Sequence, residues 1–387
     1  MIKTHKIEIY PNETMSIEIN KLFNYRRYIW NISLEIWNEQ YQKSINIGNK
    51  KIRPNGRFVR DYLVDNKQDW QYNLSSRVLQ QTVDDLDKGW KNFFNPNMPN
   101  HKRPKFKSKK NYKPTFRTDR AKIKNGKLVL DKPRRIKTPW YGIKMAEQVR
   151  FDGDIKTVTI NKEADGLYAS IVVDSECEPL KPANKDICGV DVNVKRFTYN
   201  DGEMVIYPKS LDKHYGKITY YQKMLARKRL DNPHNFRTKR YEKVRTKLRL
   251  EYRKVFNIQN DIIQKFTTQL VKDYSEIHIE DLDVQHMKMD RHMNKNLHRS
   301  QFGRLGEILT YKCEWYGREL VKVDRFYPST QICSKCGFQK TKDGYGGKQT
   351  LGGDGIHHNH QKYYCYNCGV ILDRDENAAQ NIINYSK

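Results

Sequence analysis

The chain has 387 residues, and its 73 Lys and Arg against 45 Asp and Glu leave a net charge of +28. A compact state with such an excess repels itself unless a polyanion neutralises it, and the basic residues run through the whole chain, so we expect a nucleic-acid partner. No apolar run reaches the roughly 18 residues of a membrane span, and the polar, alternating start MIKTHKIEIY is not a signal peptide, so we expect no membrane partner.

The first half of the chain is predicted to join strands to a helical segment. The alternating HKIEIY, ended by the turn residues PNET, indicates a strand. Apolar residues at three- and four-residue spacing indicate helices across residues 17–94. Turn signals NG and DG divide residues 120–176 into short antiparallel strands, which we expect to complete a barrel with the N-terminal strand.

The segment NPNMPNHKRPKFKSKKNYKP interrupts this pattern with four prolines and seven lysines or arginines. One interpretation is a solvated linker. The other, which we favour, is a surface that follows a nucleic-acid backbone, because aromatic residues alternate there with positive charge. The candidate contacts are Lys105, Lys107, Lys109 and Lys110.

The second half is predicted to be mixed α/β. The order is a buried-type strand (ICGVDVNV), a hairpin (RFTYNDGEMVIYP), a basic helical region over residues 211–273 and a strand (SEIHIEDL). A helix (FGRLGEILTYKCEWYG) that ends at Gly317 and a further strand (RELVKVDRFYP) follow. Such an order predicts a central sheet with helices beside it.

Two Cys-x-x-Cys pairs predict a zinc ribbon. Each pair forms a knuckle that supplies two thiolates, and two knuckles complete a closed tetrahedral site, in keeping with a reducing compartment. The predicted ligands are Cys333, Cys336, Cys365 and Cys368. Rival ligands in the Gly-rich spacer are His357, His358 and His360, although clustered loop histidines are more often solvated. The isolated thiols, which we expect to be buried, are Cys177, Cys188 and Cys313.

Three acids stand out by their context. Asp191 interrupts an apolar strand, Glu280 closes a second strand, and Asp375 opens the final helix. Ionised carboxylates at such places are costly unless they are paired or bind metal, and a cluster of oxygens suits Mg²⁺. Acids at strand ends also cap helices and form ion pairs, and Asp373 with Glu376 fits a capping box.

These residues resemble the TnpB (OrfB) family, transposon-encoded RNA-guided DNA endonucleases related to type V CRISPR effectors. The matching stretches include KIEIYPNE, GWKNFF, PKFKSKK, GVDVNVKRFTYNDGE, IHIEDLDVQHM, YKCEWYGRELVKVDRFYPSTQICSKCG, YYCYNCG and LDRDENAAQNI. The resemblance implies a multidomain α+β fold. An N-terminal β-barrel (wedge) with a helical recognition insertion precedes an RNase H-like RuvC α/β nuclease domain interrupted by a zinc ribbon.

The resemblance also implies domain boundaries. The wedge comprises residues 1–15 and 119–182, and it encloses the recognition domain with its basic linker at residues 16–118. The nuclease domain comprises residues 183–328 and 371–387, and it encloses the nucleic-acid-binding ribbon at residues 329–370.

For function, the resemblance implies that Asp191, Glu280 and Asp375 are catalytic and hold Mg²⁺, with two ions roughly 4 Å apart. Arg374 is expected against substrate phosphate. The expected partners are a structured guide RNA and double-stranded target DNA, and the expected assembly is a monomeric ribonucleoprotein in the prokaryotic cytoplasm at the nucleoid. Two departures from the family pattern, Asn193 and Gln264, leave open a nuclease-weak or nuclease-dead RNA-guided repressor. A compact type V CRISPR effector is the other alternative.

Overall fold

The computed structural model describes residues 1–109, 112–176, 183–192, 196–199, 203–281, 301–340 and 362–385. The chain divides into two compact units, Met1–Cys177 and Glu178–Lys387. Across the described ranges, no helix is both long enough and apolar enough to cross a lipid bilayer.

The first unit is built on a seven-stranded antiparallel sheet that forms a half-barrel. Its strands are β1 (Ile2–Tyr10), β2 (Thr115–Thr118), β3 (Lys122–Lys124), β4 (Lys127–Val129), β5 (Ile143–Met145), β6 (Asp154–Lys162) and β7 (Leu167–Asp174). They follow the order β2-β6-β7-β1-β5-β4-β3. The N-terminal strand β1 pairs with β7 from Ile2 opposite Asp174 to Ile9 opposite Leu167, so it joins the later hairpins as predicted.

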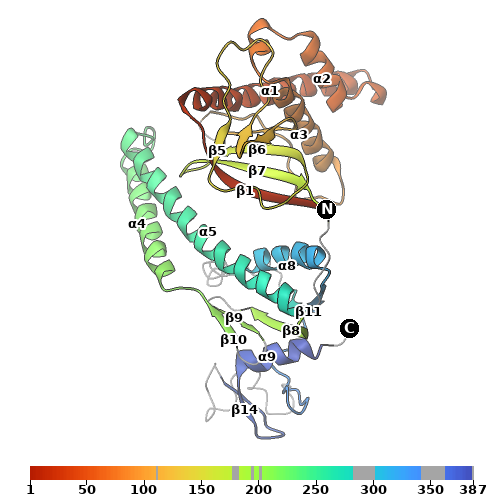
Figure 1. Ribbon diagram of the computed structural model, residues 1–387, viewed down its shortest axis with the longest axis vertical. Coiled ribbons are helices and arrows are strands. Elements are labelled where there is room, and N and C mark those ends of the chain that lie inside the picture. Colours follow the sequence, from red (N-terminus) through yellow and green to blue (C-terminus); the bar gives the residue numbers. More distant parts are fainter. Residues whose placement is uncertain are drawn as a thin grey trace. The chain divides into compact units, whose positions relative to one another are not determined.

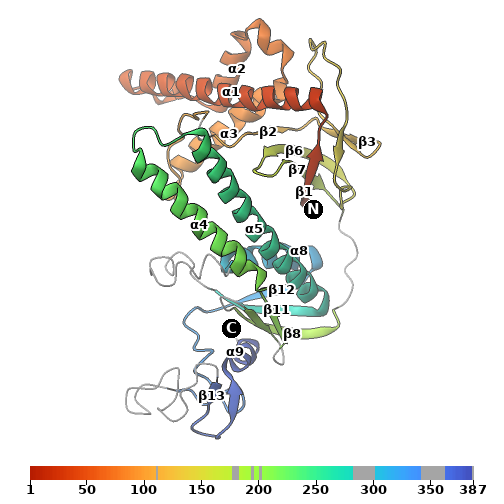
Figure 2. The ribbon, with the colours of Figure 1, turned by 90° about the vertical axis from the view of Figure 1, so that its left-hand side faces the viewer.

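Helices cover this sheet where the apolar spacing predicts them. They are α1 (Glu13–Asn46), α2 (Gly56–Asp65) and α3 (Ser76–Phe94), with 3₁₀ turns η1 (Lys50–Ile52) and η2 (Asp69–Asn73) between them. Helix α1 begins after Asn12, whose side chain accepts a hydrogen bond from the Met15 backbone N–H at 2.9 Å. It lies across the sheet (Figure 2) and packs on α3, where Trp37 stacks on Trp90 with 5.6 Å between ring centroids.

The second unit contains a five-stranded mixed sheet of the RNase H-like type. Its strands are β8 (Lys185–Val192), β9 (Arg196–Tyr199), β10 (Glu203–Ile206), β11 (Tyr274–Glu280) and β12 (Glu319–Val323). In the order β10-β9-β8-β11-β12, β11 runs parallel to β8 and β12, whereas β9 and β10 form the predicted antiparallel hairpin. The central β8 and β11 are therefore flanked by strands on both sides.

Helices lie on both faces of this second sheet (Figure 1): α5 (Lys239–Asp273) and α8 (Phe302–Tyr316) on one face, and α9 (Arg374–Ile383) on the other. Because side chains alternate along a strand, every second residue meets the same helix. Ile277 and Ile279 of β11 enter the core below α5, whereas His278 between them lies within hydrogen-bonding distance of the Ile382 carbonyl of α9, at 2.9 Å. Val190 of β8 enters the α5 core as well.

The basic helical region is a helical hairpin rather than one continuous helix. Helix α4 (Ser210–Asp231) lies beside α5 (Figure 2), and α5 starts after the N-cap Thr238, whose hydroxyl accepts a hydrogen bond from the Tyr241 backbone N–H at 3.2 Å. Helix α8 ends as predicted at Gly317, which adopts a left-handed conformation with φ 58°.

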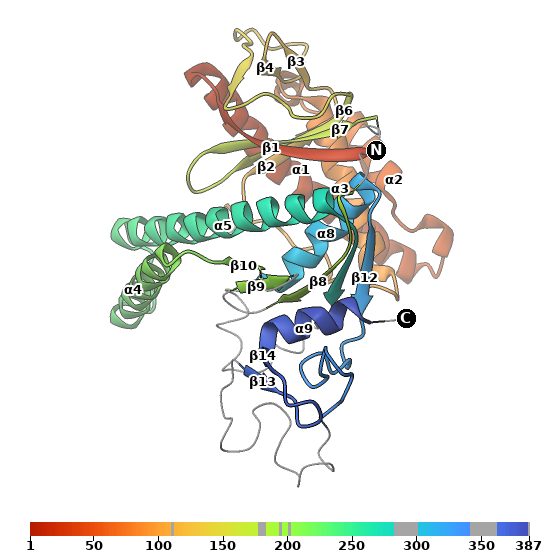
Figure 3. The same cartoon turned by 60° about the horizontal axis from the view of Figure 1, so that its bottom comes forward.

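The ribbon lies beside α9 (Figure 3), with the short antiparallel pair β13 (Lys362–Tyr364) and β14 (Ile371–Asp373). Asp373 is the N-cap of α9, because its Oδ1 accepts hydrogen bonds from the backbone N–H groups of Asp375 at 2.9 Å and Glu376 at 3.3 Å. The capping role predicted for Asp373 is therefore confirmed, and the neighbouring Asp375 is left available for another role.

Candidate metal and nucleic-acid sites

The period of two along the strands directs two of the three predicted acids, Asp191 and Glu280, to one face of the second sheet. Asp191 lies two residues after Gly189 on β8, and Gly189 meets α9. Glu280 lies two residues after His278, which also meets α9. Val190 of β8 pairs with Ile279 of β11, and Asp191 and Glu280 are the next residues on these strands. The two acids therefore occupy neighbouring positions on adjacent strands. Both strands thus direct an acid toward α9.

Helix α9 lies unusually close to β8. A Cβ atom at Gly189 would come within 2.3 Å of the Ala379 carbonyl oxygen and 3.0 Å of the Ile383 backbone nitrogen, so only glycine allows this approach. The contact fixes the height of α9 over the strand. Asp375, in the first turn of α9, is buried and contributes the third acid.

Burial and the two other acids shift the pKa of Asp191. Asp191 is only 7% exposed. Burial first, and then the negative charges of Glu280 and Asp375, raise its pKa to about 8, while the charge of Arg374 acts in the opposite direction. Burial also raises the pKa of Glu280. A site where carboxylates resist ionisation in this way is one where a bound cation is favourable, and an all-oxygen donor set fits Mg²⁺.

The third acid is ion-paired with an arginine that the sequence analysis did not identify. Arg196, the first residue of β9, forms a short ion pair with the Asp375 carboxylate. Its strand otherwise consists of buried residues, including Phe197, and this charge at the start of an apolar strand is the sequence signal that could have identified it. Within the described ranges, the predicted ribbon cysteines are the one set of metal-binding side chains whose ligand atoms all lie within 4.8 Å of one another. The acids are therefore a charge cluster, with Asp375 held by Arg196.

Helix α9 is also attached to the segment that leads from β12 into the ribbon. The Ser329 hydroxyl donates a hydrogen bond to Glu280 Oε1 at 2.9 Å, which orients that carboxylate. The Asn381 Nδ2 donates to the carbonyl oxygens of Ser329 and Ile332, each at 2.7 Å. Asn377 Oδ1 accepts from the Ser334 backbone N–H at 2.9 Å. This segment therefore connects the second acid, the ribbon and the helix of the third acid.

The four predicted ribbon cysteines form a single cluster. Cys333 and Cys368 have their sulfurs 3.8 Å apart, and those of Cys336 and Cys365 are 3.6 Å apart, distances well above a disulfide bond. Four thiols in this arrangement are a soft tetrahedral donor set that fits zinc.

The two halves of the cluster share the same turn geometry. Gly337 and Gly369 both adopt left-handed conformations, with φ 73° and 68°, and each backbone N–H donates to the carbonyl of the first cysteine of its pair at 2.9 Å. A hydrogen bond from the Phe338 backbone N–H is the largest cause that lowers the pKa of Cys336, to about 6. This thiol is therefore already disposed to act as a thiolate ligand.

The basic segment predicted as a linker or contact surface packs on α1. The Trp30 indole N–H donates to the Lys105 carbonyl at 3.0 Å. The Asn31 amide forms two hydrogen bonds with the Lys107 backbone, at 2.8 and 3.1 Å. The Lys107 ammonium lies 3.2 Å from the Trp30 ring centroid, and burial, followed by the charge of Arg26, lowers its pKa to about 7. Lys105 and Lys109 are exposed, so their predicted contact with nucleic acid stays a prediction.

The remaining residues singled out in the sequence either lie in the core or fall outside the described ranges. Cys188 and Cys313 are buried, as predicted. The residues outside the described ranges are Lys110, Cys177, Asn193, His357, His358 and His360.

Three family models match separate parts of the chain. They are the helix-turn-helix domain of OrfB from IS605 at residues 1–46, the OrfB "Probable transposase" model at residues 170–291, and the "Cas12f1-like, TNB domain" at residues 302–382. Residues 1–46 fold as strand β1 and the single helix α1, so the name of the first model does not describe their structure. The third match covers α8, β12, the ribbon and α9.

Relatives match over nearly the whole chain. A "Putative RNA-guided DNA endonuclease" of Streptomyces pristinaespiralis is 25% identical over 98% of this chain and 88% of its own length. The "Putative RNA-guided DNA endonuclease InsQ" of Escherichia coli K12 is 25% identical, with coverage of 99% and 92%. A solved Cas12f1–sgRNA–target DNA complex contains a chain with a TM-score of 0.53 and 14% identity, covering 99% of both chains, which shows a shared fold.

Proposed function

We propose that the chain is an RNA-guided DNA endonuclease of the TnpB (OrfB) family, which cuts double-stranded DNA beside a short adjacent motif at one acid-lined site. The convergence of Asp191, Glu280 and Asp375 on the face between the second sheet and α9 carries this proposal. The names given to the relatives from Streptomyces and Escherichia support it.

The proposed partners are a structured guide RNA and the target DNA. Base pairing between the guide and one DNA strand supplies sequence specificity, while the protein holds the hybrid by its shape and backbone. A net charge of +28 supplies positive charge to neutralise the phosphates of both the RNA and the DNA on one chain. Residues 1–15 and 119–182 form the wedge and residues 16–118 the recognition domain in this proposal. Residues 183–328 and 371–387 form the nuclease domain, and residues 329–370 form the ribbon.

The chemistry of the site follows from its own side chains. Asp191, Glu280 and Asp375 supply the oxygen ligands, and Ser329 holds the Glu280 carboxylate in one orientation by its hydrogen bond. Two Mg²⁺ ions bound by these carboxylates would activate a water molecule and stabilise the leaving oxygen during phosphodiester hydrolysis. The guanidinium of Arg374, whose charge acts on Asp191, offers positive charge to a substrate phosphate.

The cysteine cluster has a structural role in this proposal. A zinc ion held by the four thiolates would fold the ribbon, and the ribbon is hydrogen-bonded to α9 through Asn377 and Asn381. The metal would thereby fix the position of the helix that carries Asp375.

The test is plasmid cleavage by the purified ribonucleoprotein with Mg²⁺. Wild type is expected to cut a plasmid that carries the guide-matched target, whereas Asp191→Ala and Glu280→Ala abolish cutting and retain guided binding in a gel-shift assay. Asp281→Ala is the matched control, because this acid follows β11 but pairs with Arg325 at 3.3 Å, outside the cluster. If the wild-type complex binds its target without cutting or nicking it, the enzyme proposal is wrong.

One observation favours a second function, a nuclease-weak RNA-guided repressor. The ion pair between Arg196 and Asp375 competes with a cation for the third carboxylate. If it persists in the complex, target occupancy continues without cleavage, and Arg196→Gln then increases the cutting rate. Sequencing the RNA that co-purifies with the chain distinguishes a transposon-derived guide from the array-derived guide of a compact CRISPR effector.

A further inference from the structure

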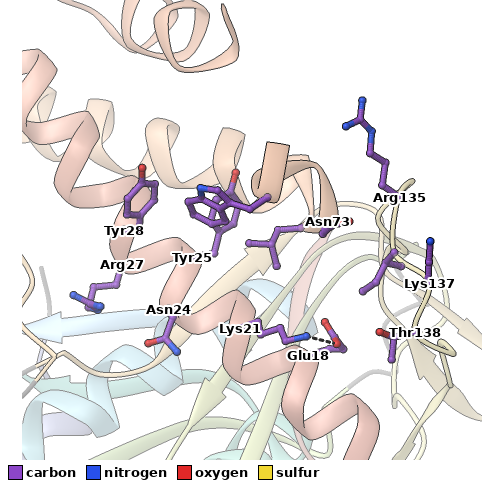
Figure 4. Close-up of a pocket in the computed structure, with 13 residues that line it drawn as sticks. Glu18, Lys21, Asn24, Tyr25, Arg27, Tyr28, Asn73, Arg135, Lys137 and Thr138 are labelled. Carbon is purple, nitrogen blue, oxygen red and sulfur yellow. Dashed lines mark hydrogen bonds and ion pairs between the residues drawn. The ribbon is translucent and has the colours of Figure 1, made fainter. Parts of the chain in front are cut away.

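The first unit contains a cavity of about 740 Å³ that the proposed cleavage site does not use. One face of α1 lines it together with η2 and residues 135–138. Figure 4 shows Tyr25 and Tyr28 at one end of the cavity and Arg135 and Lys137 at the other. Its volume lies within the roughly 300–1,000 Å³ typical of sites for small ligands.

An exposed indole forms part of the aromatic end. Trp70 of η2 is 43% exposed although it is held firmly. Its ring meets Tyr25 and Tyr28 edge-on, with centroid distances of 5.9 and 5.2 Å, and its N–H donates to Gln68 Oε1 at 2.7 Å. Because Trp70 remains 43% exposed, its indole offers surface on which a planar ligand can stack.

A buried hydroxyl at this end has no protein partner. Tyr25 is 2% exposed, and its Oη makes no hydrogen bond to any of the residues that the structure describes. Burying an unpaired hydroxyl costs free energy, so such groups are normally satisfied. The oxygen is closed to solvent in the fold described, so a ligand with a polar edge would supply the missing partner once the side chains around the hydroxyl shift to admit it.

The opposite end is positively charged. Arg135 lies 4.3 Å above the Tyr72 ring centroid, which fixes its guanidinium while leaving more than half of its side chain exposed. Lys137 and the hydroxyl-bearing Thr138 follow it along the wall. On the α1 side, the Lys21 ammonium is paired with the buried Glu18 at 2.8 Å. The acid paired with Arg135 is instead the exposed Asp69, at 3.5 Å, so an anion can compete for the Arg135 guanidinium and reach the ammonium of Lys137.

We propose that this cavity binds one unpaired nucleotide of a nucleic acid. The base stacks on Trp70, the Tyr25 hydroxyl donates to a base or phosphate oxygen, and the phosphate lies between Arg135 and Lys137. An apolar ligand would leave the cations and the hydroxyl without partners, whereas an inorganic anion would not use the aromatic end. Only the source of the nucleotide, either the guide RNA or an unpaired DNA strand, rests on the proposed function.

The test uses the full-length chain without guide or magnesium, so its outcome is independent of cleavage. The probes are trinucleotides with a central 2-aminopurine, one of ribose and one of deoxyribose type, and the relative affinity of the two identifies the source. Wild type should quench the probe by stacking. Trp70→Leu should abolish the quenching and weaken binding by about 5- to 100-fold, the range expected for one stacked base. Phe58→Leu is the matched control, because Phe58 of α2 is another exposed aromatic of the same unit, outside both the cavity and the basic segment.

Two further variants keep the proposal testable if Trp70→Leu folds poorly. Tyr25→Phe should melt no lower than wild type, because the hydroxyl has no partner in the fold, yet bind the probe about tenfold more weakly. The pair Arg135→Gln with Lys137→Gln should weaken binding more than the charge-matched pair Lys122→Gln with Lys124→Gln, which lies on β3. Quenching and affinity equal to the controls in these variants would refute the nucleotide site, while plasmid cleavage by wild type would still stand.

Discussion

Replacing Asp191 with Asn should remove the pH dependence that this residue gives to the stability of the second unit. In the unfolded chain the carboxyl has its ordinary pKa of 3.8, whereas in the fold the pKa is raised to about 8 by burial and by Glu280 and Asp375. The folded state therefore keeps a proton that the unfolded state releases, so Asp191 lowers stability as pH rises from about 4 to 8. Linkage gives a loss of about 3–4 kcal/mol between pH 5 and pH 8.

The Asn side chain has a similar shape and cannot ionise, so Asp191→Asn should remove this loss. We expect the variant to melt higher than wild type at pH 8 by roughly 10 °C, and by far less at pH 5, since 1 kcal/mol shifts Tm by about 2–4 °C in a unit of this size. The measurement is calorimetric or chemical unfolding of zinc-loaded protein in magnesium-free buffer from pH 5 to pH 8.

The control for this experiment is Asp281→Asn, which changes a carboxylate that pairs with Arg325 instead of the cluster. Its pH profile should stay close to that of wild type. Magnesium should stabilise wild type at pH 8 and have much less effect on Asp191→Asn, because the cation replaces the proton. Stability curves of wild type and Asp191→Asn that run parallel from pH 5 to pH 8 would refute the reasoning.

Three other substitutions examine the surroundings of the cluster. Gly189→Ala brings a methyl group within 2.3 Å of the Ala379 carbonyl oxygen, so it should lower the unfolding free energy by about 1–3 kcal/mol and weaken Mn²⁺ binding measured by calorimetry. The control Gly216→Ala, in open space on α4, should not destabilise the protein, and equal behaviour of the two variants would contradict the close contact. Cys365→Ser should reduce bound zinc and soluble yield, and an unchanged metal content would exclude the ribbon site. Asn381→Ala loses two hydrogen bonds and should lower the unfolding free energy by about 2 kcal/mol in denaturant titrations, so a null effect would show that the ribbon is not fastened there.

Local patterns were sufficient for much of the fold. Alternation identified β1, three- and four-residue spacing identified α1 and α3, and the two Cys-x-x-Cys pairs identified the ribbon, because each pattern reports on neighbours close in the chain. The acid at the end of β8 and the acid at the end of β11 were recognisable for the same reason, since a charge in an apolar strand needs a partner.

Features that depend on distant contacts were not predictable in this way. The Arg196–Asp375 ion pair joins residues 179 positions apart, and nothing beside either residue specifies the other. The basic segment gave no sign that Asn31 would hold its backbone against α1. The cavity beside Trp70 needs α1, η2 and residues 135–138 together, so it exists only in the assembled unit.

The position of α9 along the chain also controls when the three acids can come together. Asp191 and Glu280 leave a translating ribosome well before Asp375, which follows both cysteine pairs. Until the second pair has emerged and the ribbon has closed against Asn381, the helix that carries the third acid lacks its hydrogen bonds to the ribbon. A nascent chain thus holds an incomplete set of these acids throughout most of its synthesis.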